Sequence, residues 1–119
     1  MAFLGEESTW AAEAAECASD QNHYWEYHDI LFKKQNGENQ GAFAKENLKQ
    51  YAKELGLISG AFNDCLDLGK HTDLVKSDTE IARQIGVEST PSFLINGTPI
   101  VGAISFEEFQ SLIELHLTQ

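Results

Sequence analysis

The chain has 119 residues, which suits a single domain built around one hydrophobic core. Its formal net charge of −11 argues against nucleic acid as a partner, because phosphate backbones attract clusters of Lys and Arg and this chain has none. No run of about twenty apolar residues predicts a membrane span, and no basic start followed by an apolar run predicts a signal peptide. We therefore expect a soluble chain without a membrane partner, and its compartment stays open.

Five helices are predicted before residue 87. Ser8 is expected to cap the first, which runs to Ala18, and Asn22 is expected to cap the second, which ends near Gln35. The second helix carries a stripe that we expect to lie in the core, made of Tyr24, Trp25, His28, Leu31 and Phe32.

Three further helices are predicted over residues 48–55, 59–69 and 72–85. The first is stopped by Gly56, Ser59 is expected to cap the second, and Gly86 follows the third. Apolar residues recur at helical spacing in each, and in the last of them they are Leu74, Ile81, Ala82 and Ile85.

A β-hairpin follows these helices. The Asn96-Gly97 pair accepts the positive φ angles of a type I′ turn between strands 93–95 and 98–101. Ser105 is expected to cap a closing helix whose buried stripe is Phe106, Phe109, Leu112, Ile113 and Leu117. The predicted fold class is α+β, mostly helical.

Three separated segments carry a resemblance to a known family. They are AAEAAECASDQNHYWEYHDILFKKQ, LKQYAKELGLISGAFNDCLDLGK and GVESTPSFLINGTPIVGA. Together they resemble the DsbA-type thiol-disulfide oxidoreductases, which insert a helical subdomain into a thioredoxin-like fold. The resemblance implies one domain over 1–119, with a helical subdomain over 6–86. Residues 87–119 would form the C-terminal half of the thioredoxin-like fold, with its cis-proline loop, hairpin and final helix.

The resemblance also implies roles for Thr90 and Pro91. Pro91 matches the family's cis-proline, which faces the catalytic dithiol, and Thr90 would offer backbone groups to a protein or peptide substrate. The Cys-x-x-Cys segment itself would precede Phe3, so the chain is expected to be truncated, with no catalytic residue of its own and no cofactor. Turnover by this chain alone is doubtful. The alternative is a non-catalytic module that binds peptides or proteins as an oligomer.

The two cysteines, Cys17 and Cys65, show no Cys-x-x-Cys or zinc-ligand spacing, and the four histidines form no ligand motif, so no metal site is expected. Each cysteine falls inside a predicted helix. They are interpreted as a structural disulfide or a pair of buried thiols, with redox chemistry and separate inert thiols as the alternatives. A disulfide closing a loop of about fifty residues would stabilise the chain by on the order of 4 kcal/mol.

The hairpin predicts a partner. In the family's strand order, further strands that this sequence lacks would flank residues 93–95. Unpaired backbone groups on an apolar strand pair readily with another chain. We therefore expect a homodimer or a partner that supplies strands, with thiol or disulfide proteins as substrates by resemblance.

Overall fold

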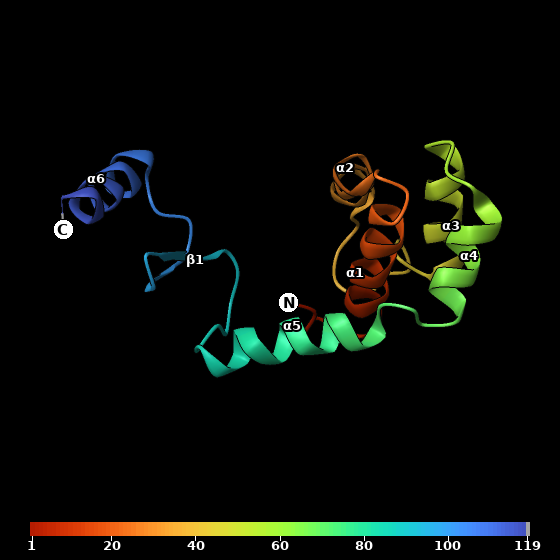
Figure 1. Ribbon diagram of the computed structural model, residues 1–119, viewed down its shortest axis with the longest axis horizontal. Coiled ribbons are helices and arrows are strands. Elements are labelled where there is room, and N and C mark those ends of the chain that lie inside the picture. Colours follow the sequence, from red (N-terminus) through yellow and green to blue (C-terminus); the bar gives the residue numbers. More distant parts are fainter. Residues whose placement is uncertain (119) are drawn as a thin grey trace. The chain divides into compact units, whose positions relative to one another are not determined.

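The computed structural model describes residues 1–118 (Figure 1). Over this range the order of elements is α1 (Glu6–Ser19), α2 (Tyr24–Lys34), α3 (Lys45–Glu54), α4 (Ser59–Asp67), α5 (Thr72–Gln84), β1 (Ser92–Ile95), β2 (Thr98–Val101) and α6 (Phe106–Leu117). The mostly helical α+β class predicted from the sequence is confirmed. Within the same range, no helix is long and apolar enough to cross a membrane.

The chain forms two compact units, Met1–Ile81 and the part that begins at Ala82. The boundary falls inside α5. The first unit holds α1 to α4, which pack against one another (Figure 1). The second holds the hairpin and α6.

The core of the first unit depends on small residues of α1. Ala14, Ala15 and Ala18 are buried, so neighbouring helices approach the α1 backbone closely. Larger side chains fill the remaining space, and the fully buried ones are Tyr27, Leu48, Phe62 and Leu66. The ring centroids of Tyr27 and Phe62 lie 5.5 Å apart, which joins α2 to α4.

Three predicted helix caps were wrong. The N-cap positions are Gly5, His23 and Ile58 instead of Ser8, Asn22 and Ser59, and no side chain caps any of these helices. Helix α1 therefore begins two residues before Ser8, and Asn22 occupies the preceding turn with φ 63°. Ser8 lies inside α1 and Ser59 is the first residue of α4, so neither occupies a cap position.

The aromatic stripe of α2 is only partly core. Trp25 and Phe32 are 69% and 70% exposed, whereas Tyr27, which the prediction left out, is fully buried. Tyr27 tolerates burial because its hydroxyl donates to the carbonyl of Leu48 at 2.8 Å. The exposed rings instead contact His28, whose ring centroid lies 5.2 Å from that of Trp25 and 4.8 Å from that of Phe32.

The predicted hairpin is confirmed. Asn96 and Gly97 take φ values of 48° and 83°, and they close an antiparallel pair in which Phe93 faces Ile100. Phe93 packs edge-on against Phe109 of α6, with ring centroids 4.9 Å apart.

The buried stripe predicted for α6 was wrong, because no residue of α6 is buried. Phe106 and Leu117 are each 77% exposed, and Ile113 is also exposed. The cause is the small area of a two-stranded sheet, which covers little of the helix. In α5, likewise, Leu74 and Ile81 are exposed, while Val75 and Thr79 are buried. Ile85, predicted to lie in this helix, follows its last residue and is also exposed.

Candidate functional site

The Thr90–Pro91 loop leads directly into β1. The peptide bond between the two residues is cis, and both residues are exposed. The carbonyl of Pro91 accepts a 2.8 Å hydrogen bond from the backbone N–H of Gly102, just after β2. Within residues 1–118 the backbone of Thr90 makes no hydrogen bond. The loop is therefore held against the hairpin while Thr90 keeps a donor and an acceptor available.

The two edges of the hairpin differ. The two-residue turn makes Ile95 and Thr98 the closing hydrogen-bonded pair, so the next pair, Leu94 and Pro99, is not hydrogen-bonded. The N–H of Leu94 consequently points to the outer edge of β1. On β2 the equivalent outward position is Pro99, which has no N–H and blunts that edge. The edge of β1 is thus the one suited to pairing with a further strand.

One face of the hairpin is uncovered in the second unit. Phe93 and Ile100 share the face that meets α6, so the alternating residues Leu94 and Val101 lie on the opposite face. Leu94 is 53% exposed and Val101 70%. An apolar face beside an unpaired edge is what a sheet presents where strands and a covering helix are missing.

Cys17 of α1 and Cys65 of α4 form a disulfide, with their Cα atoms 5.9 Å apart. Cys17 is buried, and Cys65 is partly exposed. The described chain has no free cysteine. In this state neither sulfur is a thiolate, so neither acts as a nucleophile.

A charged cluster lies beside the disulfide. The Oδ2 atom of Asp20 is 2.8 Å from the Nζ of Lys70, 2.8 Å from the Nε2 of His71 and 3.7 Å from the Sγ of Cys65. Hydrogen bonding from Lys70 is the main reason that the pKa of Asp20 falls below its usual value, with a further contribution from His71. The sequence prediction missed this cluster because His71 lies 51 positions from Asp20.

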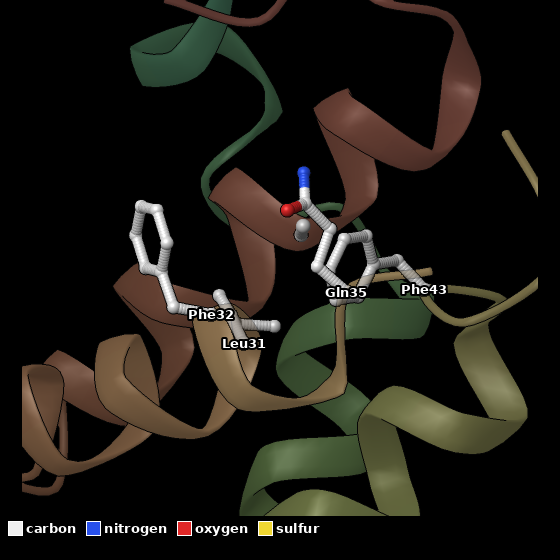
Figure 2. Close-up of a pocket in the computed structure, with 5 residues that line it drawn as sticks. Leu31, Phe32, Gln35 and Phe43 are labelled. Carbon is white, nitrogen blue, oxygen red and sulfur yellow. The ribbon is translucent and has the colours of Figure 1, made fainter. Parts of the chain in front are cut away.

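The helical unit also has a hollow with an apolar lining. Figure 2 shows Leu31, Phe32 and Gln35 from the end of α2 and Phe43 from the segment before α3 around it, and Ala11 of α1 completes the lining. The lining residues include no titratable side chain. This hollow is suited to holding an apolar group and offers no acid, base or nucleophile.

Comparisons with known proteins identify a family and several relatives of this chain. A family model described as Thioredoxin matches residues 1–115. The Na(+)/H(+) antiporter NhaA 1 of Salinispora arenicola is 32% identical over 103 residues, which are 87% of this chain and 15% of that protein. Disulfide bond formation protein D of Bacillus subtilis is 26% identical over 118 residues, which are 97% of this chain and 53% of that protein. The chain thus spans only part of these relatives.

A solved structure shares the fold. A thioredoxin-like oxidoreductase from Silicibacter pomeroyi superposes with a TM-score of 0.78 at 23% identity, over 98% of this chain and 65% of that one. The solved structure shows the same fold, and since the family model covers residues 1–115, the chain belongs to the thioredoxin-like family.

Proposed function

We propose that this chain is the substrate-holding part of a DsbA-type thiol-disulfide oxidoreductase. A Cys-x-x-Cys segment outside residues 1–119 supplies the dithiol and adds strands to β1. The observation that carries this proposal is the two-stranded sheet of the second unit. Within residues 82–118, no other element covers the outward N–H of Leu94 or the exposed Leu94 and Val101 side chains.

The Thr90–Pro91 loop supplies the substrate contacts in this proposal. A substrate peptide lies along Thr90, whose backbone has no hydrogen-bond partner within the described chain. The substrate's thiolate attacks one sulfur of the oxidised Cys-x-x-Cys, and the other sulfur leaves as a thiolate. A second substrate thiolate then resolves the mixed disulfide. The substrate is oxidised to a disulfide, and the Cys-x-x-Cys pair is reduced to a dithiol.

The cysteines of this chain have a separate role. Cys17 and Cys65 lie in the last turns of α1 and α4, away from the helix N-termini that lower a thiol pKa, and they are bonded to each other. They serve to cross-link the helical unit. The nucleophile therefore comes from the added segment.

The test is an assay of dithiol oxidation and insulin reduction with the chain alone, with an added Cys-x-x-Cys segment of a thioredoxin-like fold, and with both together. Activity above that of the segment alone is expected only in the mixture. Equal activity with and without this chain would contradict the proposal.

The two prolines provide a matched pair of variants. Pro91→Ala should raise the KM for a peptide substrate, because Pro91 lies beside the contact residue Thr90. Pro99→Ala, which changes an exposed position of β2, should leave the KM unchanged. Equal effects of both substitutions would contradict the substrate-holding role of the loop.

The disulfide favours one alternative, a binding module without turnover that works as an oligomer. With both cysteines bonded, the described chain offers no free thiol as a nucleophile, while the loop and the β1 edge are still available for contacts. In this case two copies pair through β1 and hold a peptide. A concentration-dependent dimer that binds peptide and stays inactive with a Cys-x-x-Cys segment is the expected result.

A further inference from the structure

We propose a zinc site made of Cys17, Cys65, His71 and Asp20. It cannot bind zinc while the disulfide is intact, and it binds zinc once the disulfide is reduced. This site lies in the helical unit and does not depend on the proposed oxidoreductase function. It assigns the cluster beside the disulfide to a redox-controlled metal-binding role.

The donor atoms are already close together. The sulfurs of Cys17 and Cys65 and a ring nitrogen of His71 all lie within 4.8 Å of one another. The Oδ2 atom of Asp20 lies 2.8 Å from the Nε2 of His71 and 3.7 Å from the sulfur of Cys65. With zinc bonds of about 2.0–2.3 Å, the ligand atoms of a tetrahedral site are separated by roughly 3.3–3.8 Å. Asp20 lies outside the set of three donors that are mutually within 4.8 Å, so reaching that arrangement requires its carboxylate to move in and the two sulfurs to move apart after reduction.

The backbone that carries these donors is held by contacts other than the disulfide. The side-chain amide of Gln21 makes two hydrogen bonds to the backbone of Ile58, and these join the end of α1 to the start of α4. The N–H of Lys70 donates to the carbonyl of Cys65 at 3.1 Å, which folds the segment carrying His71 back towards α4. Opening the disulfide therefore leaves the donors near one another.

The site is accessible from solvent. A surface hollow is lined by both cysteines and by Asp20 and Lys70, among other residues. Cys65 is the partly exposed sulfur and His71 is partly exposed as well, so both a reductant and a metal ion have an approach path. Buried structural cysteines without such a hollow would be inert.

The chemistry balances in two steps. A dithiol reductant attacks one sulfur of the disulfide. The reductant is released as a cyclic disulfide, and Cys17 and Cys65 become thiols. Zinc then replaces the two thiol protons, which are released to solvent. Two thiolates, one carboxylate and Zn²⁺ sum to a charge of −1, and the ammonium group of Lys70 beside Asp20 offsets it.

The ligand set matches zinc better than it matches Ca²⁺ or Mg²⁺. Thiolate and imidazole donors favour zinc, whereas Ca²⁺ and Mg²⁺ take oxygen donors. The single carboxylate oxygen of Asp20 is a common fourth ligand for zinc.

The experiment uses the full chain, oxidised or reduced with a phosphine, and titrates it with Co²⁺ as a spectroscopic stand-in for zinc. The reduced chain should show thiolate-to-cobalt charge transfer and tetrahedral bands at one Co²⁺ per chain. Addition of Zn²⁺ should abolish them, and calorimetry in two buffers should detect release of about two protons per zinc. The oxidised chain should show none of these signals.

His71→Gln tests the ligand set, with His28→Gln in α2 as the matched control. His71→Gln keeps both cysteines and should weaken Co²⁺ binding by about tenfold or more. His28→Gln should bind as the unaltered chain does. Charge-transfer bands that are absent from the reduced chain, equal binding by the oxidised chain, or equal affinities of the two variants would overturn the proposal.

Discussion

At the residue scale, the buried carboxylate of Glu7 has a clear structural task. It accepts hydrogen bonds from the N–H groups of Gly41 and Phe43 at 3.1 and 2.9 Å, and so it ties the loop before α3 to α1. Removing it would leave two donors without this partner. A charged acceptor of this kind is costly to remove, because hydrogen bonds to charged groups contribute more than neutral ones.

Glu7→Ala is expected to lower the free energy of unfolding by about 2–4 kcal/mol. Urea denaturation followed by circular dichroism measures the effect. Glu6→Ala is the control, because Glu6 is exposed and shares only the first-turn position in α1, so its loss should cost about 0.3–1 kcal/mol. Equal decreases in the free energy of unfolding for both variants would show that the hydrogen bonds from Gly41 and Phe43 contribute no stability.

A second residue-scale prediction concerns the start of α6. Ser105 and Glu108 form a capping box, and hydrogen bonds from the backbone and side chain of Ser105 lower the pKa of Glu108. A lowered folded-state pKa means that this contribution to stability is present above the unfolded-state pKa and is lost as the pH falls through the folded-state pKa.

NMR titration of the Glu108 carboxyl carbon tests this. The expected pKa lies below the ordinary value for glutamate, and Ser105→Ala should move it back up. Ser111→Ala, which alters a serine whose hydroxyl donates to the carbonyl of Glu107, should leave the pKa of Glu108 in place. A Glu108 that titrates at the ordinary value in the unaltered chain would contradict the role of the capping box.

At this scale the hairpin turn, the last helix cap and the pairing of the two cysteines were predictable, whereas three other helix caps and the contacts of Asp20 were not. The Asn96-Gly97 turn and the Ser105 cap depend on residues within a few positions, so the sequence alone predicted them. The contact between His71 and Asp20 joins residues 51 positions apart, and it requires the turn after α4 to bring Lys70 and His71 back to α1. Gly69, with φ 65°, was the one sequence signal for that turn.

At the element scale, the disulfide joins α1 to α4 across 48 positions. The double variant Cys17→Ser, Cys65→Ser should lower the free energy of unfolding by about 2–5 kcal/mol, because the uncrosslinked chain gains conformational entropy when it unfolds. Denaturation in the presence of a chelator measures this without any contribution from metal binding.

A reductant provides the control for that variant. It should destabilise the unaltered chain by a similar amount and leave the double variant unchanged. Identical unfolding midpoints for the oxidised and reduced chains would show that the cross-link contributes no stability.

The helices were predictable as elements, and their buried faces only in part. Periodic apolar residues correctly identified α2, α5 and α6, yet many of those residues are exposed, including Phe32, Ile81 and Phe106. Periodicity reports that a helix has an apolar face but not what covers that face. The strongest disagreement falls on α6, in the unit whose sheet has only two strands within the described chain.

At the scale of the whole molecule, the two compact units differ in how many of their hydrophobic residues are buried. The helical unit has a closed core of buried residues on four helices. In the second unit, Ile100 is the buried hydrophobic residue among those described. A two-stranded hairpin is marginal without further strands or helices. This chain covers 65% of the solved structure that shares its fold.

Hydrogen exchange at Leu94 tests the central claim most directly. Its N–H points away from β2, so it should exchange rapidly in the chain alone. It should slow by at least about fivefold when the Cys-x-x-Cys segment is added, because a ladder hydrogen bond is worth about 1 kcal/mol. The N–H of Phe93, already directed at β2, is the internal reference. A Leu94 amide that exchanges equally fast with and without a bound segment would contradict strand addition at β1.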